Sequence, residues 1–191
     1  METVLSLCVG VGLAAACGLR VFVPFLIMSI AAGSGHLTLS PGFQWIGSTP
    51  ALIAFSAATV LEVGGYYIPW LDHLLDTLST PAAVVAGTIV TASCVTDVSP
   101  FLRWTLAVIA GGGAASVIQA STVLGRGASS LTTGGLGNPV FATIELAGSV
   151  FTSVLSLIAP YLAIALLVVG VFLVSWKLLR LRTTPGRVST P

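Results

Sequence analysis

Long apolar segments alternate with short stretches of proline, glycine and polar residues along almost the whole chain. The first apolar segment, residues 5–30, exceeds the ~20 residues that a helix needs to cross a bilayer. Four of the five later segments begin at a proline, which suits the first turn of a helix because it lacks an amide hydrogen, and the other one follows a turn that ends at Pro100. These segments are 50–68, 69–95, 101–123, 139–158 and 160–179. The pattern predicts an all-α integral membrane protein with about six transmembrane helices.

The third apolar segment differs from the others because a second proline interrupts it. Its first part, PWLDHLLDTLS, is too short and too polar to cross a bilayer. Pro81 follows, and the residue before a proline is disfavoured in helical geometry. The remaining apolar part, residues 82–95, has the length of a half-helix. We therefore expect a discontinuous third helix.

A weak internal repeat accompanies this pattern. Pro50 is followed about 19 residues later by Pro69, and Pro139 is followed about 21 residues later by Pro160. Two three-helix halves joined in this way are inverted relative to each other, as in many secondary transporters. The repeat predicts halves at 1–98 and 99–180 and a basic, disordered cytoplasmic tail at 181–191. A chance alignment of helices that begin at proline is the alternative.

Composition supports a lipid environment. Hydrophobic residues form 55% of the 191 residues, charged residues form 7%, and the mean hydropathy is +1.06. A soluble domain carries about 25% charged residues, so water cannot be the solvent for this surface. The net charge of +1 argues against a nucleic-acid partner. Cys8, Cys17 and Cys94 lie in apolar runs without metal-ligand spacing and are expected to be buried hydrophobic residues.

The distribution of basic residues predicts the orientation. Six spans place both termini on one side, and the basic tail makes that side cytoplasmic by the positive-inside rule. Arg126 then also lies inside, whereas Arg103 lies outside and opposes the assignment. The first segment lacks a basic n-region and a cleavage site, so we interpret it as a retained transmembrane helix.

Two acidic residues lie deep within predicted spans. Glu62 must be paired, protonated or in contact with water, because an isolated charge in a bilayer costs a few kcal/mol. Its expected partner is Arg20, at similar depth in the first span, and a free ion site is the alternative. Glu145 occupies the corresponding place in the second half, where Arg126 or Arg103 could pair with it. Asp97 is expected in a turn, and His36 in a solvated loop.

Asp72 and Asp76 lie on one helical face because they are four residues apart, and His73 is close to that face. Two carboxylates with an imidazole could hold a divalent cation, which makes these three residues candidate metal ligands. An amphipathic turn with its acids in headgroup water explains them equally well. No nucleophile, zinc-protease or phosphate-binding motif is present, so we do not expect an enzyme or an organic cofactor.

The same region resembles domain-of-unknown-function family 4126, a family of small multi-span bacterial membrane proteins. The positions that match its pattern are Glu62, Pro69, Asp72, Asp76, Pro81 and Gly87, together with a first-span signature of Gly18, Leu19, Arg20 and Pro24. The resemblance extends to about Ile164. The chain has Tyr66 and Tyr67 where the family pattern has Asp-Lys. The resemblance implies a multi-pass protein of the bacterial inner membrane and no established activity.

The expected function is transport of a small solute or cation, coupled to protons or to the cation itself. Glu62, Asp72, Asp76 and His73 would form the acidic site, with Arg20 as counter-charge and Glu145 as the symmetry-related acid. The partners are the lipid bilayer and the solute, and the small size favours a homodimer. The alternatives are a scaffold or assembly subunit without transport activity, and a metal-dependent enzyme that acts on lipid.

Overall fold

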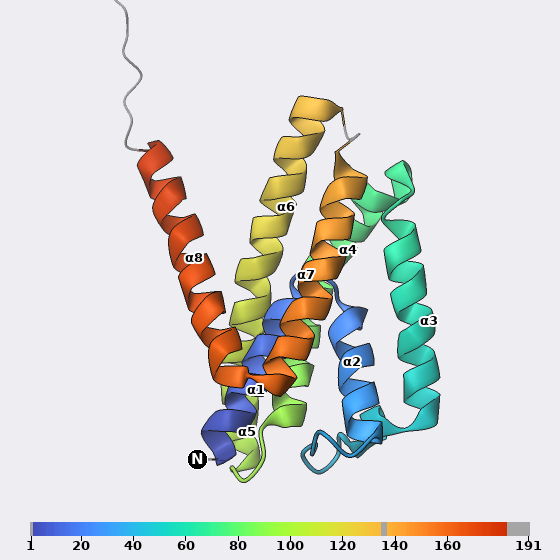
Figure 1. The fold of residues 1–191 in the computed structure, drawn as a ribbon, viewed down its shortest axis with the longest axis vertical. Coiled ribbons are helices and arrows are strands. Elements are labelled where there is room, and N and C mark those ends of the chain that lie inside the picture. Colours follow the sequence, from blue (N-terminus) through green and yellow to red (C-terminus); the bar gives the residue numbers. More distant parts are fainter. Residues whose placement is uncertain (1, 135–136, 183–191) are drawn as a thin grey trace, which may run out of the picture.

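The secondary structure is all helical over the part of the chain that the computed structural model describes. The described residues are 2–134 and 137–182, without the side chains of 69–73, 76, 133, 174–175 and 177–182. The helices are α1 (Glu2–Cys17), α2 (Phe22–Gly33), the 3-10 helix η1 (Gln44–Gly47), α3 (Thr49–Gly65), α4 (Pro69–Cys94), α5 (Pro100–Leu106), the π-helix η2 (Ala107–Gly112), α6 (Gly113–Thr133), α7 (Asn138–Ile158) and α8 (Pro160–Arg182). Figure 1 shows them as an elongated bundle.

The prolines begin the helices as predicted. Pro69 and Pro160 are the first residues of α4 and α8, and Pro139 is the second residue of α7. Before α3, the Ser48 hydroxyl accepts a hydrogen bond from the Ala51 amide at 3.4 Å. A proline in the first turn sacrifices no hydrogen bond, because the first amides of a helix have no partner within it.

The predicted first span, residues 5–30, is wrong. The helix ends at Cys17 and a new helix begins at Phe22. This second helix, α2, returns to the end of the bundle at which α1 begins (Figure 1). Accordingly, Glu2 at the start of α1 and His36 after α2 line the same cavity. We call α1 and α2 the re-entrant hairpin.

Two residues explain the position of this break. A Cβ atom on Gly18 would lie 2.5 Å from the Ala115 carbonyl oxygen, so the end of α1 approaches α6 too closely for any other residue. Pro24 then falls in the first turn of α2, where its missing amide costs nothing. Glycine at a helix end followed by proline near a helix start is a recognised boundary signal.

The hairpin changes the direction of the rest of the chain. From α3 onward the helices run along the bundle in alternating directions, and α8 ends at the opposite end from the start of α1 (Figure 1). Within the described residues, the start of α1 and the end of α8 thus lie at opposite ends of the bundle. Alternating directions also arise in any up-and-down chain, so they do not test the predicted inverted repeat.

The predicted discontinuity of the third segment is also wrong. α4 is one helix of 26 residues with Pro81 in its interior. A proline removes one amide donor, and in membrane helices neighbouring groups satisfy the freed carbonyl. The chain thus has a broken helix, but in its first apolar segment and not in its third.

The fourth segment continues beyond its predicted end at residue 123. The helical chain runs from Pro100 through the π-helix to Thr133, and Gly134 ends it with a left-handed φ of 64°. The helix therefore extends ten residues beyond the predicted end of this span. As a result Arg126 is on a helix that faces α7.

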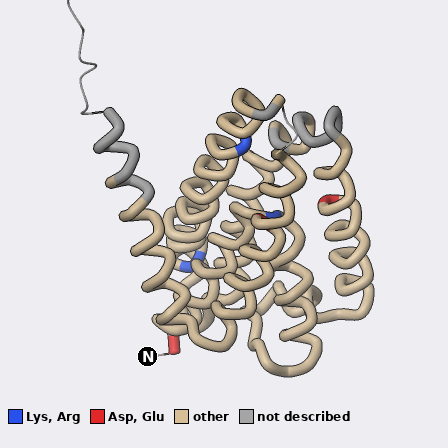
Figure 2. Tube along the Cα trace, turned by 45° about the horizontal axis from the view of Figure 1, so that its top comes forward, with Lys and Arg blue, Asp and Glu red and all other residues tan. Residues whose placement is uncertain are grey.

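The bundle is apolar on its outside, and the face that α7 turns inward is small or polar. Leu61, Phe101 and Ile158 have 74%, 82% and 77% of their surface exposed. The buried residues of α7 are instead Asn138, Ala142, Glu145, Ser149, Ser153 and Ser156. Charged positions are sparse in the described part of the chain (Figure 2). Large side chains facing outward and small ones between helices are typical of proteins that fold in lipid.

Helix length agrees with this environment. Among the described residues, three helical stretches are long and apolar enough to cross a membrane: Thr77–Cys94, Pro100–Thr132 and Asn138–Ile158. The shorter apolar stretches are Glu2–Cys17, Phe22–Gly33, Thr49–Gly65 and Pro160–Leu173. These findings support a membrane protein.

The closest helix crossing joins α4 to the π-helix. A Cβ atom on Gly111 would lie 2.2 Å from Thr91 Oγ1 and 2.6 Å from the Gly87 carbonyl oxygen. The second contact is with backbone, which cannot move aside. Gly113, two residues later, has open space around the same position.

Gly111→Ala should therefore lower stability by about 1–3 kcal/mol, the usual cost of overpacking. Gly113→Ala should leave stability unchanged or raise it slightly, because alanine favours the helix. Thermal unfolding of both variants in detergent, followed by circular dichroism, measures the difference. Equal melting temperatures for the two variants would contradict the close approach of α4 and the π-helix at Gly111.

Candidate functional site

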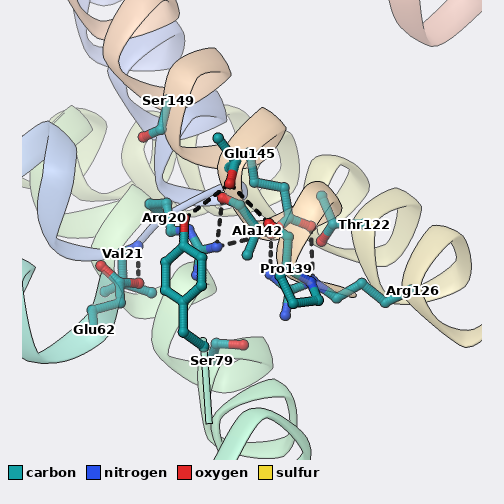
Figure 3. Close-up of polar contacts among 12 residues, drawn as sticks. Arg20, Val21, Glu62, Ser79, Thr122, Arg126, Pro139, Ala142, Glu145 and Ser149 are labelled. Atoms are coloured by element: carbon teal, nitrogen blue, oxygen red, sulfur yellow. Dashed lines mark hydrogen bonds and ion pairs between the residues drawn. The ribbon is translucent and has the colours of Figure 1, made fainter. Parts of the chain in front are cut away.

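The break between α1 and α2 places the N-terminus of α2 inside the bundle. The amide of Val21 donates to Glu62 Oε1 at 2.7 Å, and the amide of Phe22 donates to Glu62 Oε2 at 3.0 Å. Glu62 comes from the last turns of α3 and reaches across to α2 (Figure 3). Because the first amides of a helix are unpaired and carry partial positive charge, a carboxylate is well placed there.

Arg20 lies in the same turn and directs its guanidinium towards α7. Its Nη2 atom donates to the Ala142 carbonyl at 2.9 Å and lies 3.3 Å from Glu145 Oε2. In the view of Figure 3, Glu62 and Glu145 lie on opposite sides of Arg20. Arg20 therefore connects the hairpin to α7.

Glu145 also binds a second arginine. Arg126 on α6 donates from Nε to Glu145 Oε1 at 2.9 Å, and its Nη2 binds the other carboxylate oxygen. A guanidinium that binds both oxygens of a carboxylate has well-matched geometry and is stronger than a single contact. Glu145 is thus shared by two arginines from different parts of the chain.

Tyr66, the residue after α3, joins the two arginines. The guanidinium carbons of Arg20 and Arg126 lie 3.8 Å and 4.1 Å from the centre of its ring. An aromatic face attracts a cation, and the attraction is larger where water is excluded. The ring therefore lowers the repulsive cost of two neighbouring positive charges.

These residues, which we call the central charge cluster, are Arg20, Glu62, Tyr66, Arg126 and Glu145. Its four charged side chains are only 2–8% exposed. Removing a charge from water costs several kcal/mol unless it is paired, so this burial requires compensation. With both arginines positive and both glutamates negative, the formal charges sum to zero.

Serine side chains complete the surroundings. Ser149 on α7 donates to the Ala16 carbonyl at 3.1 Å and so binds a carbonyl at the C-terminal end of α1. Gln119 on α6 donates to Ser79 on α4 at 3.0 Å. The two backbone ends created by the break thus have different partners, a hydroxyl for α1 and a carboxylate for α2.

The predicted pairings have mixed outcomes. The direct ion pair between Glu62 and Arg20 is wrong, because Glu62 binds backbone amides and Arg20 binds Glu145. The pairing of Glu145 with Arg126, one of two predicted alternatives, is confirmed. Asp97 lies in a turn as expected, with a φ of 58°.

The acidic group on α4 lies outside the described side chains. Asp72, His73 and Asp76 belong to the N-terminal part of α4, and their proposed role as metal ligands stays a prediction. Elsewhere in the described part of the chain, no three His, Cys, Asp or Glu side chains lie close enough together to hold a metal ion.

Sequence reasoning named Arg126 as a candidate partner of Glu145 but missed Tyr66 as a member of the cluster. The signal for Arg126 was the pair of candidate partners for Glu145, since a buried carboxylate requires a cation nearby.

A cavity of about 1100 Å³ opens at the end of the bundle where α1 begins. Its polar lining includes Glu2 of α1, His36 after α2, Gln44 of η1, Asp97 before α5 and Arg103 of α5. Between this cavity and the central charge cluster, α1 carries Leu13 and Cys17, which are fully buried in the hydrophobic core. The cavity is therefore separated from the cluster by apolar packing.

Comparison with known protein families finds a match over most of the chain. Residues 7–180 match the family described as a domain of unknown function, DUF4126. The chain belongs to the DUF4126 family. No curated protein and no solved structure matches this family member significantly. The match covers both the re-entrant hairpin and every residue of the central charge cluster.

Glu145→Gln should destabilise the protein by about 3–5 kcal/mol, because two buried arginines lose the carboxylate that they share. Glu2→Gln makes the same chemical change at an exposed position and should alter stability by less than about 0.5 kcal/mol. Detergent unfolding curves for both variants provide the comparison. A Glu145→Gln variant as stable as Glu2→Gln would show that the cluster is not held by this carboxylate.

Proposed function

We propose that this protein transports a small solute or ion across the membrane, coupled to protons, through the central charge cluster. The observation that carries the proposal is the re-entrant hairpin, whose break lies among four buried charged side chains. Broken helices near charged groups are the usual construction of substrate sites in secondary transporters. Intramembrane ionisable groups generally serve such pathways, because their burial is costly.

The cavity supports a route to this site. It opens next to the first residues of α1, and apolar packing lies between it and the cluster. A transporter in one of its alternating states has such an entrance. In this proposal the hairpin moves relative to α7. The ion pair and the hydrogen bond of Arg20 to α7 can exchange partners during this movement.

The proposed membrane topology differs from the simple six-span arrangement. The hairpin enters and leaves from one side, and the chain crosses in α3, in α4, from α5 to α6, in α7 and in α8. The basic end of α8 and the connection after α6 then lie in the cytoplasm, and α1 begins outside. The bacterial inner membrane, the homodimer and the inverted repeat stay predictions.

Single-cysteine labelling tests this topology in a variant without the three native cysteines. A tag before Glu2 and a cysteine at Ser34 should be accessible from the same side, because the hairpin returns to its starting end. A cysteine at Ile68, in the connection between α3 and α4, should react from the other side. Labelling of Ser34 and the tag from opposite sides would instead establish a simple first span.

A flux screen in proteoliposomes tests transport. Gradients of protons, sodium, divalent cations, chloride and formate are imposed in turn on wild-type protein and on Glu62→Gln. Loss of the proton-accepting group should reduce proton movement linked to solute flux by about two orders of magnitude. Gly113→Ala, which has open space around it and lies outside the cluster and the cavity, is the control and should behave as the wild type. Well-folded wild-type protein without flux of any of these solutes would overturn the proposal.

A further inference from the structure

The carboxylate of Glu62 occupies a position that resembles a bound anion. Two consecutive amides at the start of α2, from Val21 and Phe22, donate to its two oxygens at 2.7 Å and 3.0 Å. Helix N-termini bind free carboxylates and phosphates by this geometry. Here the anion is a side chain of α3, so it is attached to the protein but does not belong to the helix that it caps.

Arg20 supplies the second observation. It is 2% exposed, and its Nε and Nη1 atoms have no hydrogen-bond partner among the described residues. A buried donor without a partner costs about 1–3 kcal/mol, which native proteins seldom tolerate. Arg20 directly precedes Val21, so its side chain starts from the same turn as the α2 amides. Its guanidinium pairs with Glu145 and not with Glu62. An anion that uses both sets of donors would therefore lie between the α2 amides and this guanidinium.

The charges of the cluster specify how many anions it can accept. Arg20 and Arg126 are balanced by Glu145 and Glu62 when all four are ionised. Protonation of Glu62 leaves one excess positive charge in a site that excludes water. Binding of one monovalent anion restores neutrality, whereas binding of a second would leave one excess negative charge. A charge imbalance at this depth is strongly unfavourable, so proton and anion should bind together.

An apolar groove reaches the same turn from the side. It has a volume of about 530 Å³, and Val21 and Phe22 line it together with Phe55 of α3 and Pro81 of α4. The groove opens between α2, α3 and α4. It gives a lipid tail a place beside the turn, so an anion could arrive either from water or as a lipid headgroup.

We propose that Glu62 is a tethered anion covering an anion-binding site at the N-terminus of α2, and that one monovalent anion replaces it when Glu62 takes up a proton. The ligand is held by the Val21 and Phe22 amides and by the free donors of Arg20. The proton stays on the displaced Glu62 carboxyl group, and no covalent bond to the anion forms. The coupling of this exchange to flux rests on the proposed transport function, whereas the binding site does not.

Several other ionisable groups surround Glu62. They are Cys17 on α1, Arg20 in the hairpin turn, Tyr66 after α3, Arg126 on α6 and Glu145 on α7. α2 contributes its amides, and the acids of α4 lie outside the described side chains. Because these groups are unchanged when only Glu62 is substituted, a change in the pH dependence of anion binding can be assigned to Glu62.

Chemical rescue tests the binding site. Glu62→Ala removes the tethered carboxylate, and its melting temperature in neutral detergent should fall below that of the wild type. Sodium formate or sodium chloride should then restore much of the loss in a saturable way, because a ligand of the folded state stabilises it by mass action. Ionic strength is held constant with sodium gluconate. At neutral pH the wild type and Glu2→Ala should not respond to either anion.

A second variant and a lipid arm keep the test decisive. If Glu62→Ala does not fold, Glu62→Gln preserves the side-chain volume and should still gain stability from formate or chloride. Mixed micelles containing phosphatidylglycerol, compared with phosphatidylcholine, distinguish a lipid headgroup from a free anion. Stabilisation by either source supports the site. Absence of a response to formate, chloride and phosphatidylglycerol overturns it, as does rescue of Glu145→Ala without rescue of the Glu62 variants.

Flux measurements separate this inference from the transport proposal. Wild-type anion uptake should increase as pH falls, with about one proton per anion as the charge balance requires. Glu62→Gln should carry the anion downhill without dependence on pH. Rescue without flux would leave the anion site standing and refute transport. Proton-coupled flux of a cation without rescue would support transport and overturn the anion site.

Discussion

The break between helices α1 and α2, at residues 18–21, imposes a constraint on the rest of the bundle. It leaves the first amides of α2 without helical partners in a region where water is excluded, whereas the Ala16 carbonyl at the end of α1 accepts from the Leu19 and Arg20 amides of the turn. Glu62 binds the α2 amides from α3, and Ser149 of α7 adds a further hydrogen bond to the Ala16 carbonyl. α3 must therefore lie where the Glu62 carboxylate reaches the start of α2.

The placement of the remaining charges follows from that arrangement. Glu62 is engaged by backbone amides, so Arg20 turns to Glu145, which also pairs with Arg126. Tyr66 lies against both guanidinium groups. The result is a compact group in which every formal charge has a partner, although Arg20 retains donors that are not hydrogen-bonded.

Close packing in other parts of the bundle contrasts with this polar region. α4 and the π-helix meet through Gly87 and Gly111 with almost no space between their backbones. Such a crossing is rigid, because neither backbone can yield. The hairpin turn combines both kinds of contact, because Gly18 approaches the α6 backbone as closely while hydrogen bonds and ion pairs hold Arg20 and Val21.

The sequence by itself determined the all-helical class, the lipid environment, the helix starts at proline and the family. Each of these depends on local properties, namely apolar length, sparse charge, and the missing amide of proline. It also singled out Arg20, Glu62 and Glu145, because burial of a charge is costly wherever it occurs. The tertiary structure decided which helix is broken, since Gly18 ends α1 through a close approach to α6 whereas Pro81 is tolerated within α4. It also decided the pairing, because the choice among Glu62, Glu145 and the helix amides depends on distances between segments that are far apart in the chain.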